Sequence, residues 1–267
     1  MSEDLILKKL DITDLKNLID LQDKIIADLK EDEQHFILHR TASDFLNALE
    51  SDSTYVFGLY DGDRLVSQSI LSLPKNGDKR EISEFLSERK NSELAVYKAV
   101  LVDPAYRGRG LMKRMLRTRE EAAIMNGRNT AITQIAADNP ASWVNALRYG
   151  MQITQVGTDP EDGAKVIYLQ KRLDGKKEPL LDMAQSFAMP LGQDIHKHVQ
   201  ILFNKMQKLS AEGWVATNLI MDKSGFKLMW HPLEKVSHLK EIAVKKTEPQ
   251  QTHFTMQNQY GTAHFQR

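Results

Sequence analysis

The first 173 residues carry apolar positions in two kinds of spacing, one typical of strands and the other typical of helices. The strand-like stretches are short apolar runs or alternations, and the helix-like stretches repeat their apolar residues every three or four positions. In chain order these patterns predict a strand at 5–10, a helix after Thr13 reaching residue 29, a helix at 42–49, strands at 55–60, 65–73 and 94–102, a helix at 111–125, a strand at 130–136, a helix at 140–149, and strands at 151–156 and 165–173. The order β-α-α-β-β-β-α-β-α-β-β indicates an α+β fold with a central sheet flanked by helices.

Two breaks in composition divide the chain. A charged stretch at 74–92, with a short helical pattern at 82–86, interrupts the strands and is predicted to be an insertion. Gly, Lys, Glu and Pro at 174–179 are typical of a linker. We therefore expect an N-terminal domain at 1–173, a small unit at 174–246 and a flexible tail at 247–267.

The small unit is predicted to have the order α-β-β-α. A helical apolar stripe runs from Ile195 to Leu209, two strands at 214–221 and 226–231 flank a Gly-containing turn, and a last helical pattern covers 233–242. Three aromatic residues on the two strands are expected to form its core: Trp214, Phe226 and Trp230. No internal repeat is evident in the sequence.

The composition excludes several classes of function. Lys plus Arg and Asp plus Glu both number 36, so the chain has no global basic field for nucleic acid. Cysteine is absent, which excludes disulfides, thiolate metal sites and a cysteine nucleophile. His196 and His198 lie two apart on a helix and cannot share one face as metal ligands, so no metal is expected. No apolar run is long enough for a membrane span or a signal segment, so we expect a cytoplasmic protein.

The clearest chemical signal lies at residues 100–113. A buried strand ends at Asp103-Pro104, a loop with Gly108 and Gly110 turns, and a helix begins at once. Glycine lets a backbone approach a ligand closely, and the free N–H groups at a helix start favour an anion. Between Arg107 and Arg128 the sequence has seven basic residues and two glutamates, as expected where a polyphosphate binds. The alternative is a solvated basic helix face behind an ordinary turn.

Other phosphate motifs fit this stretch less well. A dinucleotide fingerprint needs Gly or Ala three residues after Gly110, where this chain has Lys113, and the surrounding elements are not a parallel β-α series. A P-loop needs Gly-Lys followed by Ser or Thr, which the chain lacks at this spacing.

Strand, Val-Asp-Pro, Tyr-Arg-Gly-Arg-Gly-Leu-Met and helix together resemble the coenzyme A binding motif of the GNAT superfamily of N-acetyltransferases. The element order of residues 1–173 agrees, and Asn139, Ser142 and Gly150 are similar to family residues downstream. Met112 departs from the motif, which has a small residue there, and is expected to point into the core. The resemblance implies a mixed, mostly antiparallel sheet over two thirds of the chain and leaves residues 174–267 unexplained.

The resemblance also implies how acetyl-CoA is bound as co-substrate. The backbone of the central strand would pair with the pantetheine arm, the loop and helix start would hold the pyrophosphate through main-chain N–H groups, and a main-chain N–H near Leu101 would hold the oxyanion. The binding residues implied are Val100, Leu101, Val102, Arg107, Gly108, Arg109, Gly110, Leu111, Met112, Lys113, Asn139 and Ser142. An Asn before Pro is also a common helix cap, which is the alternative for Asn139.

The family moves an acetyl group by direct attack of an amine on the thioester, and two protons must move. Its usual acid and base positions are occupied here by Ala146 and Gln134. Tyr149, one helical turn beyond Ala146, is a candidate acid, with packing beside Gly150 as the alternative. Glu93 and Tyr97, at the start of the central strand, are candidates for a base acting through water. The alternative for Glu93 is a solvated loop charge.

The acceptor is suggested only by charge. An acidic segment after the first helix would overhang the acceptor cleft in this fold and attract a cationic amine or a basic peptide or protein; it comprises Asp28, Glu31, Asp32 and Glu33. The first hypothesis is therefore an acetyl-CoA-dependent N-acetyltransferase acting on a primary amine. A catalytically silent CoA-binding or sensing module and an interaction protein working through its C-terminal unit are the alternatives. A homodimer is left open.

Overall fold

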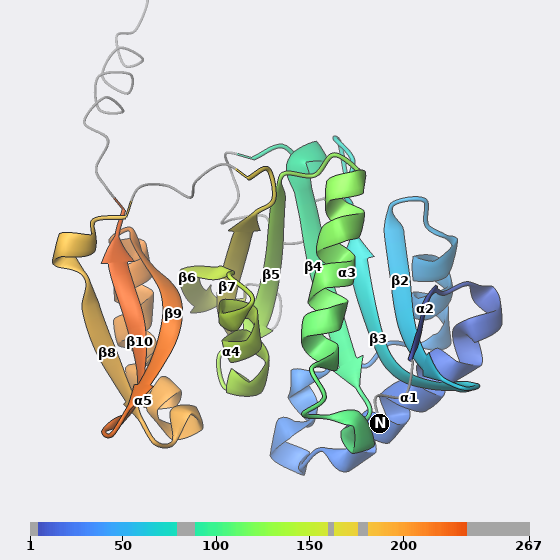
Figure 1. The fold of residues 1–267 in the computed structure, drawn as a ribbon, viewed down its shortest axis with the longest axis horizontal. Coiled ribbons are helices and arrows are strands. Elements are labelled where there is room, and N and C mark those ends of the chain that lie inside the picture. Colours follow the sequence, from blue (N-terminus) through green and yellow to red (C-terminus); the bar gives the residue numbers. More distant parts are fainter. Residues whose placement is uncertain (1–4, 79–88, 160–162, 176–180, 234–267) are drawn as a thin grey trace, which may run out of the picture. The chain divides into compact units, whose positions relative to one another are not determined.

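The computed structural model describes residues 5–78, 89–159, 163–175 and 181–233 (Figure 1). The N-terminal part contains β1 (Ile6–Lys9), α1 (Leu15–Asp28), the 3-10 helix η2 (Glu31–Phe36), α2 (Ala42–Glu50), β2 (Thr54–Asp61), β3 (Arg64–Ser72), β4 (Leu94–Val102), α3 (Leu111–Met125), β5 (Thr130–Ala136), α4 (Pro140–Arg148), β6 (Gln152–Thr158) and β7 (Lys165–Arg172). The predicted element order and fold class are confirmed. The helical pattern at 82–86 lies outside the described residues.

The start of the first helix differs from the prediction. Thr13 does not cap α1. Asp11 caps the short 3-10 turn Ile12–Asp14 that precedes α1, and its carboxylate accepts from the Thr13 backbone N–H at 2.8 Å and from the Thr13 hydroxyl at 2.6 Å. Asp14 is the N-cap of α1 and makes no side-chain capping bond.

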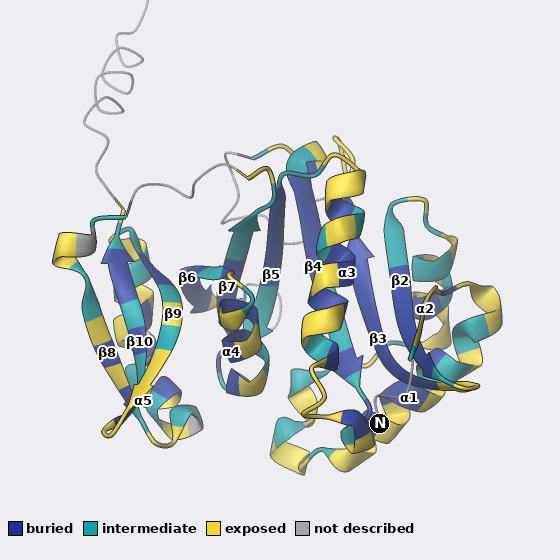
Figure 2. Ribbon diagram, viewed as in Figure 1, coloured by how far each residue is buried: buried dark blue, intermediate teal, exposed yellow. Residues whose placement is uncertain are grey.

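The strands form one mixed sheet in the order β1-β2-β3-β4-β5-β7-β6-β9-β10-β8. Only β4 and β5 run parallel among the named pairs, and the others are antiparallel. On one face, α3 lies along β3 and β4 (Figure 1) and buries Met115 and Leu116. On the other face, α1 and α2 bury Leu18 and Phe45 against β2 and β3. The central strands are therefore buried on both faces (Figure 2).

β4 and β5 separate along their length. They pair only from Leu94 opposite Thr130 to Val96 opposite Ile132. Beyond that point the Thr133 hydroxyl donates to the Tyr97 carbonyl at 2.7 Å, which holds the two strands together where backbone pairing ends. We call the space between the strands beyond Tyr97 and Thr133 the fork.

The C-terminal elements extend the same sheet. They are β8 (Phe187–Gly192), α5 (Ile195–Ala211), β9 (Trp214–Asp222) and β10 (Gly225–Pro232). The predicted helix and hairpin are present, whereas β8 was not predicted and the last helical pattern lies outside the described residues. Pro190 within β8 explains the omission, because proline is tolerated in a strand only at a sheet edge, and β8 is the edge.

These elements repeat a topology already present in the chain. In both β5-α4-β6-β7 and β8-α5-β9-β10, the last strand lies between the other two and pairs with each of them in an antiparallel ladder. The two sets meet at Ile153 opposite Ala216, each three residues after a glycine with positive φ that ends the preceding helix, Gly150 at 89° and Gly213 at 84°. The chain therefore repeats a topology, although no repeat is evident in its sequence.

The two sets also pack reciprocally. α4 contacts β9, and α5 contacts β6. Val199, Phe203 and Met206 of α5 belong to the same hydrophobic core as Ile153 and Val156 of β6. The described residues up to Leu233 accordingly form one compact unit. The division at residue 173 stays a prediction about chain organisation, and the predicted tail lies outside the described residues.

Candidate active site

The loop after β4 is anchored by a carboxylate that the sequence marked only as a strand end. Asp103 is fully buried and accepts hydrogen bonds from Lys24 at 2.7 Å, Arg64 at 2.6 Å and the Ala105 N–H at 3.0 Å. Burial alone would raise the pKa of Asp103, but these donors outweigh it and lower the pKa. Asp103 thereby ties the loop to α1 and β3.

The loop then presents bare backbone. Gly108 and Gly110 have φ of 76° and 77°, and a Cβ added at either would meet no atom within 4 Å. Gly110 is the N-cap of α3 and provides no side chain to cap it, and the first helical bond runs from the Arg114 N–H to the Gly110 carbonyl at 3.1 Å. The N–H groups at 111–113 therefore precede the helical ladder and leave an anion site at the helix start.

The side chains around this helix start divide into two groups. Leu111 is buried and Met112 packs partly on the core, which confirms the expected direction of Met112. Lys113 is exposed. Arg107 bonds Asp28 at 2.8 Å, and the guanidinium of Arg109 lies 4.7 Å from the Tyr106 ring centre. Both arginines are thus held beside the loop.

The basic field is smaller than the sequence count implied. Arg119 is buried, and Arg128 donates to the carbonyl groups of Leu73, Pro74 and Asn91 at 3.0–3.2 Å. Both arginines are structural cations within the fold, so five of the seven counted charges stay available to the helix start and its outer face.

The predicted pantetheine strand borders the fork. Val100, Leu101 and Val102 pair with β3 on one edge of β4, and their other edge lies beyond the three residues of β4 that pair with β5. Leu101 is buried toward α1, and the other two pack partly on the core beside α3. The free edge of β4 is therefore where an extended chain with amide groups would add hydrogen bonds.

Asn139 and Ser142 meet at the start of α4. The Asn139 side-chain oxygen accepts from the Ser142 backbone N–H at 3.1 Å, so Asn139 is the N-cap of α4. The cap engages the carbonyl oxygen of the side chain, and the same loop follows the end of β5 across the fork.

Tyr97 lies where the fork opens. Its side chain is 2% exposed, its hydroxyl has no hydrogen-bond partner among the described residues, and the Arg119 guanidinium lies 4.5 Å from its ring centre. Burial raises the pKa of Tyr97, and the nearby Arg119 partly opposes that rise. Desolvation also lowers the pKa of Arg119 to about 10, so it stays charged at neutral pH. This buried cation beside Tyr97 had no signal in the sequence.

Tyr149 is held differently. Its ring lies under the Lys171 ammonium at 4.2 Å, and Lys171 bonds Glu120 at 2.7 Å. Burial raises the pKa of Tyr149, and its hydrogen bond to Glu120 raises it further. The hydroxyl is thus directed to a carboxylate of α3.

Glu93 lies at the other end of β4 from the loop. It is half-buried and accepts from the Lys90 N–H at 3.1 Å and from the Asn129 amide at 3.2 Å, and these hydrogen bonds lower its pKa. The fork opens on the far side of the three paired residues Leu94, Ala95 and Val96. Sequence proximity placed Glu93 and Tyr97 together, but the strand separates their surroundings.

The acidic segment is tied at both ends. Arg107 bonds Asp28 at 2.8 Å at the end of α1, and His35 of η2 bonds Asp138 at 3.0 Å on the loop before α4. Glu31, Asp32 and Glu33 begin η2 between these two ties. The segment therefore links the loop after β4 with the loop after β5.

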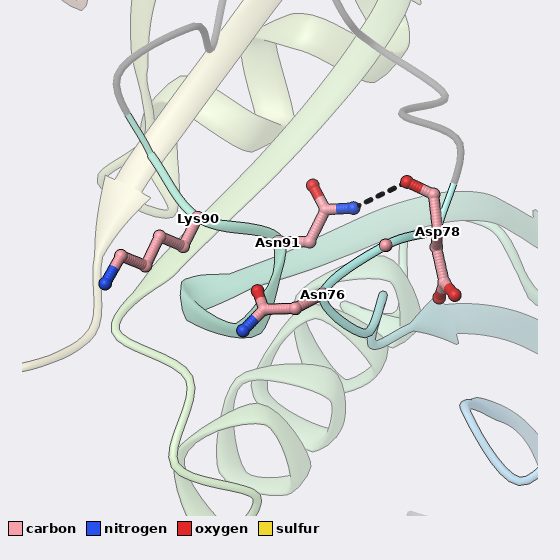
Figure 3. A pocket seen from close by; sticks show the side chains of 5 residues that line it. Asn76, Asp78, Lys90 and Asn91 are labelled. Carbon is pink, nitrogen blue, oxygen red and sulfur yellow. Dashed lines mark hydrogen bonds between the residues drawn. The ribbon is translucent and has the colours of Figure 1, made fainter.

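A hollow of about 410 Å³ lies away from this loop and is lined by Asn76, Gly77, Asp78, Lys90 and Asn91 (Figure 3). The Asn91 amide donates to the Asp78 carbonyl at 2.9 Å and to the Lys75 carbonyl at 3.2 Å, which fixes one wall. It borders residues 79–88, outside the described ranges, and it is not the helix-start site. In the described part of the chain, no helix is long and apolar enough to span a membrane, and no three His, Asp or Glu side chains gather as a metal site.

Known proteins resemble this chain in sequence and in fold. Residues 20–150 match the acetyltransferase (GNAT) family. A putative acetyltransferase from Salmonella typhimurium, solved with its cofactor acetyl-CoA, aligns with a TM-score of 0.50 and 16% identity over 66% of this chain and 98% of its own. The ribosomal-protein-S18-alanine N-acetyltransferase from Escherichia coli aligns with a TM-score of 0.49 and 15% identity over 66% and 98%. No curated protein matches the sequence. Residues 20–150 are therefore identified, from the family match, as an acetyltransferase domain of the GNAT family.

Proposed function

We propose that the protein transfers an acetyl group from acetyl-CoA to a primary amine. The observation that carries the proposal is the start of α3, where two glycines with positive φ and an uncapped helix terminus follow the strand that borders the fork. A pyrophosphate is the anion that such a backbone site fits, and the free edge of β4 fits an amide-containing arm beside it.

Acetyl-CoA supplies the activated acetyl thioester when bound. Gly108, Gly110 and the N–H groups at 111–113 hold its pyrophosphate, with Arg107, Arg109 and Lys113 adding positive charge. Val100, Leu101 and Val102 pair with the arm, with a main-chain N–H near Leu101 for the oxyanion, and Asn139 and Ser142 bound the far side of the fork.

The acceptor in this proposal is a cationic amine, either a small molecule or the amine of a peptide or protein. The support is the acidic segment, since Glu31, Asp32 and Glu33 lie between ties to the two loops that flank the fork. Negative potential at this position raises the local concentration of a cation.

Tyr97 protonates the departing sulfur in this proposal. Its raised pKa keeps the hydroxyl protonated at neutral pH, and Arg119 stabilises the tyrosinate formed when the proton leaves. Tyr149 is the second candidate for this proton, and its hydroxyl must first leave Glu120. Glu93 as a base through water is the less favoured part of the proposal, because it lies at the paired end of β4.

The test is a panel of small amines and basic peptides incubated with acetyl-CoA, with release of free thiol as the measurement. We expect thiol release with at least one cationic amine and formation of the matching N-acetyl product by mass spectrometry. Binding of acetyl-CoA without release on any acceptor would favour the silent CoA-binding module, which the residues Gln134 and Ala146 at the usual proton-handling positions also suit.

A further inference from the structure

The two faces of the fork carry different chemistry. Ala131 of β5 lies with Ala95 and Tyr97 in the core beside α3, whereas Ile132 forms a separate cluster with Leu94 and Val96. Because side chains alternate along a strand, Gln134 lies on the same face as Ile132. Gln134 and Tyr97 therefore belong to opposite faces of the sheet at the point where the strands separate.

Gln134 holds a carboxylate at this point. Its side-chain amide donates a hydrogen bond to Asp159, the residue that follows β6. The Asp159 N–H donates to the Ala164 carbonyl at 2.8 Å, and the Asp159 carbonyl accepts from the Gly163 N–H at 2.9 Å. Both the backbone and the side chain of Asp159 are thus fixed from separate directions.

The hairpin that carries Asp159 is braced by the C-terminal elements. Lys165 pairs with Thr158 next to Asp159, and its ammonium lies 5.2 Å from the Phe203 ring centre on α5. The Val156 N–H donates to the Ser210 hydroxyl at 3.1 Å. The C-terminal set β8-α5-β9-β10 therefore helps to hold the Asp159 carboxylate in place.

We propose that Asp159, oriented by Gln134, is the proton acceptor for the ammonium group of the acceptor. This inference rests on the proposed function. An amide side chain has no site that takes up a proton at neutral pH, but a carboxylate bonded to it does. Gln134 on β5 is thus a positioning residue, and Asp159 of the β6–β7 hairpin provides the carboxylate.

The proton balance of the reaction then closes. The ammonium gives one proton to Asp159, which passes it to solvent, and the nitrogen lone pair forms the new C–N bond with the acetyl carbon. The C–S bond breaks, the sulfur takes the Tyr97 proton, and the nitrogen loses its second proton to solvent to become the amide. Solvent returns a proton to Tyr97, so one proton is released for each acetyl group transferred.

The experiment compares wild type with Asp159→Asn, Asp159→Glu, Gln134→Glu and Glu93→Gln. Asp63→Asn, which changes an exposed carboxylate of the β2–β3 turn, is the control. Acetyl-CoA affinity is measured by calorimetry, and kcat/KM for a cationic amine is measured from pH 6 to pH 9. We expect Asp159→Asn to lower kcat/KM at pH 7 by at least tenfold, since a positioned general base contributes about 10² to 10⁴ in rate. The loss should shrink as pH rises, because the unprotonated amine becomes available from solvent.

The other variants separate a chemical role from a structural one. Asp159→Glu should keep most of the wild-type pH profile, and Gln134→Glu should move its acid limb to higher pH, because two adjacent carboxylates raise the pKa of one of them. The role of Asp159 would be overturned, with the proposed function intact, if Asp159→Asn bound acetyl-CoA with wild-type affinity and kept the wild-type pH profile of kcat/KM. A pH profile that changes in Glu93→Gln instead would overturn it as well. A wild-type protein that binds no acetyl-CoA would overturn the proposed function and this inference with it.

Discussion

Replacing Tyr97 by Phe should make the protein more stable and less active. The Tyr97 hydroxyl is buried and has no hydrogen-bond partner among the described residues, whereas its ring packs in the core under Arg119. An unsatisfied buried polar group costs about 1–3 kcal/mol, so its removal should raise the free energy of unfolding by about 1 kcal/mol. For a domain of this size that corresponds to a rise in Tm of about 2–4 °C.

The matched control is Tyr60→Phe. Tyr60 is also buried, but its hydroxyl donates to Asp14 at 2.5 Å and accepts from the Asn17 amide at 3.1 Å, and burial raises the pKa of Tyr60 to about 12. Removing this hydroxyl should lower the free energy of unfolding by about 1–3 kcal/mol, because two partners lose their bond. It should leave acetyl transfer unchanged, since Tyr60 lies in the core beside α1.

The assay is thermal unfolding and acetyl-CoA turnover on the same preparations. For Tyr97→Phe we expect a higher Tm, a turnover at least tenfold lower, and an unchanged acetyl-CoA affinity. A loss of 1 kcal/mol or more of stability would show that the hydroxyl has a structural partner. Unchanged turnover would show that another group protonates the sulfur, and the reasoning from the orphaned hydroxyl would fail.

Three further predictions concern the loop, the second tyrosine and the C-terminal unit. Asp103→Asn should lower the free energy of unfolding by about 1.5–3 kcal/mol at pH 7 and weaken acetyl-CoA binding. Because the pKa of Asp103 is lowered in the folded state, its contribution to stability is present above its ordinary pKa and is lost as pH falls through the lowered value. Urea titrations from pH 2 to 7 should therefore converge for variant and wild type at the acid end. Tyr149→Phe should change turnover less than threefold in the thiol assay, and a tenfold loss would transfer the role of acid to Tyr149. Phe203→Ala should lower stability by about 3–5 kcal/mol in a single transition followed by calorimetry, because α5 shares a core with β6; two separate transitions would show an independent module.

The strand, loop and helix at 94–125 could be predicted because their signals are local. Asp103-Pro104 ends the strand, and glycines begin the helix, so β4 and α3 have the predicted bounds. The direction of Met112 followed from the helical stripe, for the same reason.

The proton-handling groups could not be predicted in this way, because each depends on pairing between distant strands. Gln134 meets Asp159 only because β7 lies between β5 and β6 in the sheet. Arg119 belongs by composition to a basic helix, and its burial over Tyr97 follows from how α3 lies on β4. The repeated topology of β8-α5-β9-β10 could not be predicted, because no repeat is evident in the sequence and because Pro190 argues against a strand at β8.

The most direct test of the central claim is calorimetric titration of acetyl-CoA into wild type, Gly110→Val and Gly127→Val. Both glycines have positive φ, 77° and 70°, and a Cβ at either would meet no atom within 4 Å, so the two variants share the same backbone strain at opposite ends of α3. The account predicts that wild type and Gly127→Val bind acetyl-CoA and that Gly110→Val does not, because the new side chain occupies the space of the pyrophosphate. Equal affinity in Gly110→Val and Gly127→Val would contradict a phosphate site at the start of α3.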